Sequence, residues 1–393
     1  MQTFYIIGIS DDRNQFLSPE IRNLVSQGKV FSGGKRHHEL VHAYLPEDAV
    51  WIDITVPLDA VFCRYEEHSE IIVFASGDPL FFGFANTVMR KLPSAKIILF
   101  PTFNSLQMLA HRILLPYQEM QTLSLTGRPW DAFDSALIRG DKLIGVLTDR
   151  EKTPATIAAR MLEYGYDNYR MIVGEALGNG EEESVRTFSL EEASQSAFRF
   201  PNCLILQRNK VHPRPFGVPE SEFHLLNGRN KMITKMPVRL LTLSMLTLRE
   251  KKSFWDIGFC TGSVSIEAKL QFPELKVTAF EQRTEGKELM ERNSRKFGTP
   301  GITTVMGDFL ETELGGLPAP DAVFIGGHGG KMIEILQKIK EVLLPDGVIV
   351  FNSVSEESKA LFTKGITQIN KKVTQCTRIA VDTFNPIEIM RAE

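Results

Sequence analysis

The stretch WDIGFCTGSVSIEA at residues 255–268 contains the first residues whose types and spacing suggest chemistry. A short apolar run ends at Asp256. Gly258, Cys260 and Gly262 then lead into a helical pattern, and small residues there let a ligand approach the amides that open the helix. The GxGxxG fingerprint of dinucleotide-binding proteins is absent, as is the GxxxxGKS/T loop of NTPases. The loop therefore predicts either another kind of cofactor site or a plain tight turn.

Two more acidic residues stand at the ends of strand-like runs further along the chain. The run KVTAFE ends at Glu281, where a carboxylate can accept both ribose hydroxyls of an adenosine. The following run leads to Gly307 and Asp308, at the height where an adenine ring would lie. Three acidic strand ends in this order predict a cofactor that contains adenosine.

This set of residues resembles the class I S-adenosylmethionine-dependent methyltransferases. The resemblance implies that Glu281 binds the ribose and that Asp308 and Phe309 lie at the adenine. It also implies that the loop faces the methionine and ribose, through Asp256, Gly258, Phe259, Cys260, Thr261 and Gly262. Cys260 stands where the family usually has glycine, and its Cβ is expected to narrow the loop.

Residues 220–393 resemble one family within this class, the C15-methylating, C12-decarboxylating component of cobalamin biosynthesis. The resemblance rests on the TK and VR pairs that end at Arg239, on the loop, and on FIGGHGG around His328. It implies that Thr234 contacts the cofactor, and that Lys235, Arg239 and His328 position the carboxylates of a substrate. The D/N-P-P-Y/F/W motif of amino-methylating nucleic-acid enzymes is absent. Arg229 is a further cation, for which a surface charge is the simpler interpretation.

The first half carries a different loop, in IIVFASGDPLFFG at 71–83. SGDP is a good turn sequence in any protein, but it occurs here with GGKRH at 33–37, PTFNSLQ at 101–107 and SLTGRP at 124–129. Together these segments resemble the tetrapyrrole methylases, which are class III S-adenosylmethionine enzymes, and most closely their C5-methylating precorrin component. The resemblance implies cofactor contacts from Ser76, Gly77, Asp78, Phe81, Asn104 and Ser105.

Two features of this half depart from the family or point elsewhere. Gly8 is followed by Ile9, Ser10 and two aspartates, where the family commonly has a GxGxG-type loop that shapes the tetrapyrrole cleft. His38 and His42 are spaced like metal ligands on a helix, but no third ligand stands nearby. We therefore expect a solvated helix face and no metal.

The elements that must position these residues alternate between strand-like and helix-length runs along almost the whole chain, which predicts an α/β protein. The prolines of VHPRPFGVPE interrupt the alternation. We therefore expect an N-terminal bilobal tetrapyrrole methylase (class III) domain over 1–209 and a class I Rossmann-like methyltransferase domain over 216–393. In the second domain the expected strands lie near 253–257, 275–281, 302–306, 321–326 and 347–352, with edge strands between 367 and 391.

The composition excludes several classes of function. The chain has 393 residues, a formal net charge of −3 and no basic stripe, which argues against nucleic acid as its main partner. No apolar run approaches the length of a membrane span, so we expect a cytoplasmic protein without a membrane partner. The four cysteines show no CxxC spacing. The families resembled here are usually oligomeric, which implies a homo-oligomer.

The two resemblances meet in the family of fused precorrin-6Y C5,15-methyltransferases (decarboxylating). They imply methylation of precorrin-6Y, or of its cobalt form, at C5 and C15. They also imply loss of CO2 from the C12 acetate, which gives precorrin-8X in cobalamin biosynthesis, with one S-adenosylmethionine site in each domain. Two alternatives stay open: a methyltransferase of RNA or another small metabolite, and a corrinoid-binding protein whose methylase loops have decayed.

Overall fold

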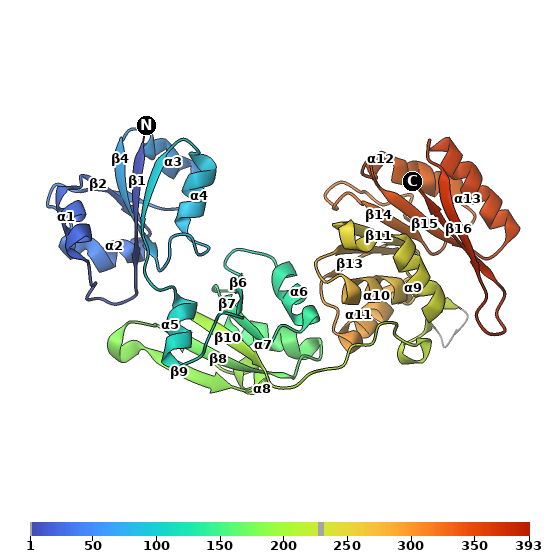
Figure 1. Ribbon diagram of the computed structural model, residues 1–393, viewed down its shortest axis with the longest axis horizontal. Helices are drawn as coiled ribbons and strands as arrows, with labels where there is room; N and C mark the ends of the chain where they lie inside the picture. The colour runs from blue at the N-terminus through green and yellow to red at the C-terminus, as the bar shows by residue number, and fades with distance from the viewer. Residues whose placement is uncertain (1, 227–231) are drawn as a thin grey trace. The chain divides into compact units, whose positions relative to one another are not determined.

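The computed structural model describes residues 2–226 and 232–393. The chain forms two compact units (Figure 1). The first consists of Met1–Arg128, Lys142–Ala159 and Tyr169–Asn209, and the second of Pro129–Asp141, Arg160–Asn168 and Lys210–Glu393. Two short segments of the range 1–209 thus cluster with the second unit. The expected domain boundaries stay a prediction.

The first unit begins with a five-stranded, fully parallel sheet of order β3-β2-β4-β1-β5. Its strands are β1 (Thr3–Ile9), β2 (Val30–Gly33), β3 (Val50–Asp53), β4 (Glu70–Ser76) and β5 (Lys96–Phe100). The connecting helices are α1 (Pro19–Gln27), α2 (Lys35–Val41), α3 (Asp59–Tyr65) and α4 (Phe84–Lys91). The central strand β4 is buried from Ile71 to Ala75, which fits its uninterrupted apolar run.

A second, mixed sheet of order β6-β7-β10-β8-β9 follows in the same unit. Its strands are β6 (Gln121–Ser124), β7 (Leu143–Leu147), β8 (Tyr169–Glu175), β9 (Ser184–Phe188) and β10 (Asn202–Arg208). The helices of this part of the chain are α5 (Ser105–Arg112), α6 (Asp131–Arg139), α7 (Pro154–Glu163) and α8 (Leu190–Ser194). Helix α5 packs on β10 through Leu106 and Leu109, which share a core with Ile205. Two sheets agree with the expected bilobal construction.

The second unit contains a seven-stranded sheet of order β13-β12-β11-β14-β15-β17-β16. Its strands are β11 (Ser253–Ile257), β12 (Lys276–Glu281), β13 (Ile302–Met306), β14 (Ala322–Ile325), β15 (Val348–Ser353), β16 (Val373–Ile379) and β17 (Ile387–Ala392). The principal helices are α9 (Met236–Met245), α10 (Ser263–Gln271), α11 (Glu285–Phe297), α12 (Met332–Val342) and α13 (Glu356–Gln368). The first five strands are parallel and β17 is antiparallel. The doubly wound order and the edge hairpin confirm the expected class I fold.

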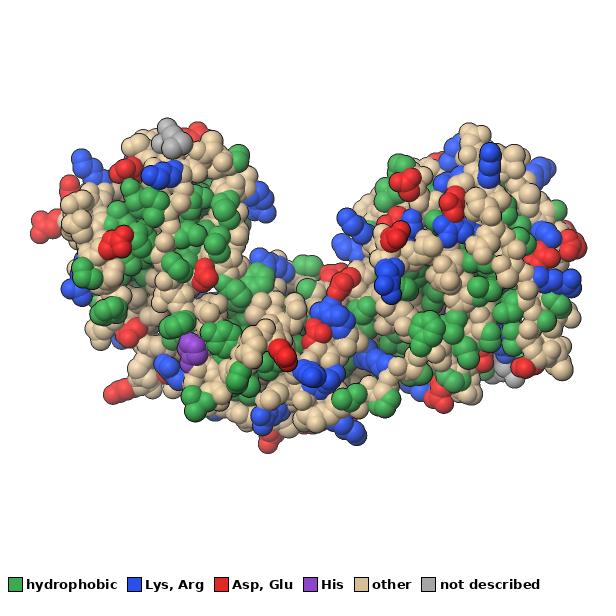
Figure 2. Space-filling view, viewed as in Figure 1, with side chains coloured by type: hydrophobic (Ala, Val, Ile, Leu, Met, Phe, Trp, Pro, Cys, Tyr) green, Lys and Arg blue, Asp and Glu red, His purple; other side chains and the backbone are tan. Residues whose placement is uncertain are grey.

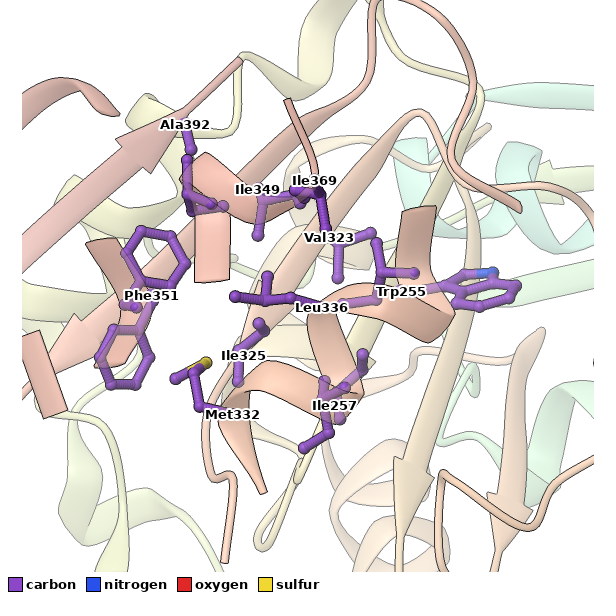
Figure 3. Close-up of a cluster of buried hydrophobic side chains, with 14 of the residues drawn as sticks. Trp255, Ile257, Val323, Ile325, Met332, Leu336, Ile349, Phe351, Ile369 and Ala392 are labelled. Atoms are coloured by element: carbon purple, nitrogen blue, oxygen red, sulfur yellow. The ribbon is translucent and has the colours of Figure 1, made fainter. Parts of the chain in front are cut away.

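The core of this unit lies on both faces of the sheet because its strands are buried on both sides. Along β11, Trp255 and Ile257 face the cluster that α12 and α13 cover, whereas Phe254 belongs to the cluster under α9 and α10. Figure 3 shows the first cluster, where Leu336 of α12 lies against Val323 and its neighbours. The order β12-β11-β14 leaves a crevice at the carboxyl ends of these strands, where doubly wound sheets bind ligands.

The surface carries charges of both signs. On the face shown in Figure 2, Lys and Arg are interspersed with Asp and Glu in each unit. This distribution agrees with the small net charge of −3 and shows no basic stripe on that face. None of the helices formed by residues 2–226 and 232–393 has both the length and the apolar character to cross a membrane.

Candidate active site

A cavity of about 720 Å³ opens at the carboxyl ends of β11, β12, β13 and β14 in the second unit. One part of its wall consists of predicted adenosine-binding residues: Gly258, Cys260, Glu281, Asp308 and Phe309. Another part contains the predicted positioning residues Thr234, Lys235 and His328. The fold therefore brings together eight predicted site residues that are spread over about a hundred positions of sequence.

Glu281 ties the loop of β11 to the end of β12. Its side chain is almost completely buried, and Oε2 accepts a hydrogen bond of 2.9 Å from the backbone N–H of Cys260. Its Oε1 accepts from the N–H groups of Gln282 and Arg283, each at 3.0 Å. Arg283 also approaches the carboxylate at 3.3 Å but is largely solvated. A carboxylate offers about four acceptor positions, and three of these are taken by backbone N–H groups. The fourth can accept a ligand hydroxyl in place of the exposed arginine.

The loop itself takes three left-handed backbone positions, with φ of +78° at Gly258, +52° at Cys260 and +75° at Gly262. A Cβ on Gly258 would lie 2.9 Å from the backbone nitrogen of Gly327, so this loop and the loop after β14 touch through their backbones. Cys260 is the non-glycine member, and a left-handed residue with a Cβ costs about 1 to 2 kcal/mol. This cost explains why the class I family usually has glycine at the position of Cys260, where this chain has a residue with a Cβ.

Asp256 lies beneath the loop and does not line the cavity. Its Oδ2 accepts from the N–H of Ser265 at 3.2 Å and from the hydroxyl of Ser265 at 2.6 Å, which joins the end of β11 to α10. Its Oδ1 has no hydrogen-bond partner among residues 2–226 and 232–393. Burial is the main cause that raises the pKa of Asp256 to about 7.

Three other predicted loop residues are also placed behind the cavity wall. Phe259 packs in a core cluster with Ile266. The carbonyl of Thr261 accepts from the side chain of Asn293 at 2.9 Å, and Gly262 lies where a Cβ would meet Met290. These residues stabilise the conformation of the loop. Of the loop residues predicted to contact the cofactor, only Gly258 and Cys260 are among those that line the cavity.

Asp308, which the sequence predicts to lie near an adenine, forms an ion pair at the cavity wall. Its Oδ2 lies 2.8 Å from Nζ of Lys331, while Oδ1 accepts from the N–H of Leu310 at 2.9 Å. The hydrogen bond from Lys331 lowers the pKa of Asp308, so the side chain is a carboxylate at neutral pH. Phe309 meets Phe280 edge to face at 5.0 Å and forms an apolar wall beside this pair.

Cationic, aromatic and amide groups also line the cavity. Nζ of Lys235 lies 4.6 Å above the ring of Phe384, a residue of the β16–β17 connection. His328 accepts a hydrogen bond from the N–H of Gly330 at Nδ1, which places the remaining proton of the neutral ring on Nε2. Oδ1 of Asn352 accepts from Thr242, so its NH₂ group is left to donate elsewhere. Such groups can hold the carboxylates of an aromatic or conjugated ligand.

The predicted loops of the first unit adjoin at one edge of its parallel sheet. Gly77, at φ +63°, donates its N–H to the carbonyl of Ile9 at 2.9 Å. A Cβ on Gly77 would lie 2.8 Å from Cα of Asn104, so the loops after β4 and β5 are in close contact. Oδ1 of Asp78 accepts from the N–H of Leu80 at 2.8 Å.

The remaining predicted residues of this unit are placed around that edge. Asn104 caps α5, whose first residue is Ser105, by accepting from the N–H of Gln107 at 3.0 Å. Ser76 is exposed at the end of β4, and Phe81 packs in the core beneath α5. His38 stacks on Trp51 with ring centroids 4.4 Å apart.

Comparisons with known proteins agree with both halves. The family model for a precorrin methyltransferase domain matches residues 227–392. A precorrin-6Y C(5,15)-methyltransferase [decarboxylating] of Sinorhizobium sp is 33% identical over 371 residues, which is 91% of this chain and 86% of the relative. The chain belongs to this family. The protein of the same name from Mycobacterium tuberculosis strain H37Rv is 25% identical, and the match covers 93% of this chain and 90% of the relative.

A third protein resembles only part of this precorrin-6Y C5,15-methyltransferase family member. It is the cobalt-precorrin-6B C(15)-methyltransferase (decarboxylating) of Salmonella typhimurium, 33% identical over 162 residues. The match covers 41% of this chain and 83% of the relative.

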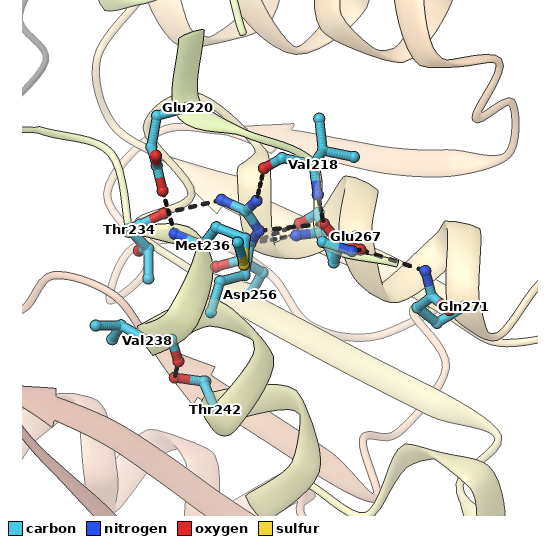
Figure 4. Close-up of polar contacts among 12 residues, drawn as sticks. Val218, Glu220, Thr234, Met236, Val238, Thr242, Asp256, Glu267 and Gln271 are labelled. Carbon is cyan, nitrogen blue, oxygen red and sulfur yellow. Dashed lines mark hydrogen bonds and ion pairs between the residues drawn. The ribbon is translucent and has the colours of Figure 1, made fainter. Parts of the chain in front are cut away.

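The structure corrects one prediction about substrate binding in this member of the precorrin-6Y C5,15-methyltransferase family. Arg239 is fully buried and does not line the cavity. It donates to the carbonyl of Thr234 at 2.9 Å and to the carbonyl of Val218, and lies 3.4 Å from Oε2 of Glu267. These three partners are labelled in Figure 4. Glu267 in turn accepts from the N–H groups of Gly217 and Val218. Arg239 holds the segment before α9 in place and is not available to a substrate carboxylate.

Sequence reasoning missed several polar residues of the cavity, among them Arg283, Lys331 and Asn352. Arg283 follows Glu281 by two positions, and Lys331 follows the FIGGHGG segment, so their proximity to predicted residues was the available signal. Asn352 lacked any motif, because its role depends on Thr242 at the far side of the sheet. Arg229, the fourth cation considered, lies outside the described residues.

Proposed function

We propose that this chain uses S-adenosylmethionine to methylate precorrin-6Y, or its cobalt form, at C5 and C15, with loss of CO2 from the C12 acetate. The observation that carries the proposal is the match to a precorrin-6Y C(5,15)-methyltransferase over 91% of the chain, which includes both units. The cavity of the second unit supports it, because it combines an adenosine-type wall with cationic and aromatic groups. A corrinoid-binding protein with decayed methylase sites would not need to retain the adenosine-type wall as well as the cationic and aromatic groups.

The residues of the second unit fit S-adenosylmethionine. Gly258 and Cys260 line the cavity beside Glu281, whose carboxylate offers acceptor capacity for a ribose hydroxyl. Asp308, with its ion-pair partner Lys331, would face the adenine amino group. When bound, the cofactor supplies an electrophilic methyl group on a sulfonium centre.

The chain's own groups then act mainly by orientation. Carbon nucleophiles of a reduced tetrapyrrole need no strong base, so correct placement supplies much of the rate. Lys235 and the amide of Asn352 would hold peripheral carboxylates, and Phe384 offers a face for the conjugated ring. His328 presents Nε2–H as a neutral donor, since burial lowers its pKa. The macrocycle itself serves as the electron sink for the loss of CO2.

We assign the two methylations to separate domains, with C5 at the loops after β1, β4 and β5 and C15 with decarboxylation at the cavity of the second unit. Ser76, Gly77, Asp78 and Asn104 supply the first cofactor site in this assignment, which gives one site per domain. The proposed boundaries are 1–209 and 216–393. We also propose a cytoplasmic homo-oligomer, as the family resemblance implies.

Mass spectrometry of the product tests the proposal. The full chain is incubated with S-adenosylmethionine and precorrin-6Y, and in parallel with the cobalt form. A gain of two methyl groups with loss of one CO2 is the expected result, and isotopic labelling of the methyl donor locates the new carbons. Unchanged tetrapyrrole that still binds the protein would favour a corrinoid-binding role, and methylation of RNA in the same assay would contradict the proposed substrate.

A further inference from the structure

One contact in the first unit joins the GGKRH segment at 33–37 to the loop that follows β4. His37, on helix α2 after β2, places Nε2 2.8 Å from the hydroxyl of Ser76 at the end of β4. The two residues are 39 positions apart and lie at the carboxyl edge of the same parallel sheet, because β2 pairs with β4. Ligands of open α/β sheets bind at this edge.

A second hydrogen bond fixes which ring nitrogen of His37 carries the proton. The backbone N–H of Gly34 points to Nδ1 of His37 at 3.2 Å, and a backbone N–H can only donate. Nδ1 is therefore the acceptor and Nε2 carries the hydrogen, which it donates to Oγ of Ser76. Burial, with a smaller effect of Arg36, lowers the pKa of His37 to about 4, so this neutral tautomer persists at physiological pH.

The position of the ring is tightly set by its neighbours. A Cβ on Gly33 would lie 3.0 Å from the Trp51 ring and 3.1 Å from Cβ of His37, so α2 approaches the end of β2 as closely as a glycine allows. Arg36, the preceding residue, forms an ion pair with Asp11 in the loop after β1. These contacts orient His37 independently of Ser76.

The hydrogen bond from His37 leaves the proton of Ser76 Oγ–H unused. Ser76 is exposed, and within residues 2–226 and 232–393 no side chain or carbonyl accepts this proton. The neighbouring N–H of Gly77 is already committed to Ile9, and the Arg36 charge is matched by Asp11. The Ser76 hydroxyl is thus a neutral, pre-oriented donor at the ligand edge of the sheet.

We propose that His37 is a positioning residue that orients the Ser76 hydroxyl to donate to a ligand carboxylate during methylation by the first unit. This inference rests on the proposed function. A carboxylate is the partner with the greatest gain, because hydrogen bonds to charged acceptors are about twice as strong as neutral ones. Both reactants carry this group: the methionine part of the cofactor and the acetate and propionate side chains of the tetrapyrrole.

Steady-state kinetics of the full chain test the inference, with C5 methylation followed separately from C15 methylation and CO2 release. Ser76→Ala and His37→Phe are expected to raise KM for one reactant by about 10- to 100-fold, the range for a hydrogen bond to a charged group. His37→Gln, which returns an N–H near the place of Nε2, should stay within about threefold of wild type. Titrating each reactant in turn identifies whose carboxylate is bound.

Two controls separate positioning from a structural role. His42→Gln changes an exposed histidine just after the same helix and should leave KM unchanged. His37→Phe also removes the hydrogen bond from Gly34. If this variant lost activity only because the first unit folds less well, C5 methylation would fall in His37→Phe, while Ser76→Ala would keep the wild-type KM. The double variant Ser76→Ala/His37→Phe should lose no more than the worse single variant, since both act through one hydroxyl.

Several outcomes would overturn the inference. The proposed action of His37 through Ser76 is excluded by any one of three results. These are an unchanged KM for both reactants in Ser76→Ala, a defect confined to His37→Phe, and additive losses in the double variant. If the wild-type chain makes no methylated product, the proposed function fails on its own. Equilibrium binding of S-adenosylmethionine and of precorrin-6Y then decides this inference, and it is rejected if Ser76→Ala alters neither affinity.

Discussion

At the scale of residues, Glu281 has a double task, since one carboxylate both fixes the loop and faces the cavity. We predict that Glu281→Ala weakens S-adenosylmethionine binding to the second unit by about 1 to 3 kcal/mol, the cost of leaving buried polar groups unpaired. Calorimetry measures this change. Glu285→Ala, an exposed acid four residues further on, is the matched control. An affinity equal to wild type would remove Glu281 from the ribose role.

Asp256 gives a prediction about pH. Its folded-state pKa is raised from 3.8 to about 7, so the folded protein keeps this proton while the unfolded chain releases it. Stability contributed by the protonated form is therefore lost as pH rises from about 4 to about 7. Asp256→Asn lacks this titration, so its stability relative to wild type should increase over that range.

Thermal unfolding at pH 5, 6, 7 and 8 checks the sign of the Asp256 effect. Asp346→Asn, at an exposed aspartate, should leave the difference from wild type constant with pH. A stability of Asp256→Asn minus that of wild type that stays constant or falls as pH rises would show that the pKa of the buried carboxyl is not raised. The sequence predicted Asp256 as a site residue but not this burial, which depends on how α10 and Ser265 close over it.

At the scale of elements, the sequence predicted the parallel strands of the second unit well, because each is a short apolar run followed by small or acidic residues. β11, β12 and β13 lie where they were expected, and the edge hairpin of β16 and β17 extends from Val373 to Ala392, one residue beyond the expected 367–391. Helix α9 starts beside Pro237, as the proline predicted. The burial of Arg239 was not predictable, because it depends on Val218 and Glu267, which are remote in sequence.

Arg239 therefore carries a prediction for the element that it holds. Arg239→Met should destabilise the second unit by about 3 to 5 kcal/mol, because Glu267 would be left as an uncompensated buried charge. Arg239→Met with Glu267→Gln should cost less than Arg239→Met alone. Urea unfolding measures both, and Arg249→Met replaces an exposed arginine as the control. A fully stable Arg239→Met variant with a raised KM for substrate would restore the substrate role.

At the scale of the whole molecule, the two cofactor sites are proposed to work independently. Among the described residues, those that line the cavity of the second unit lie between 232 and 387, and none comes from 2–209. The seven-stranded sheet is likewise formed entirely from residues after 252. We therefore predict that residues 216–393 fold alone, bind S-adenosylmethionine, and yield a product that has gained one methyl group and lost one CO2.

The same fragment should be less stable than the second unit in the full chain. It lacks the segments 129–141 and 160–168, which cluster with that unit, and so loses the hydrogen bonds from Ser135 to Pro273 and from Tyr166 to Gly298. Calorimetry should nevertheless give the fragment a cofactor affinity within about threefold of the full chain, since none of these groups lines the cavity. A folded fragment that binds no cofactor would mean that the site needs the first half of the chain, and the assignment of one methylation to each domain would then be wrong.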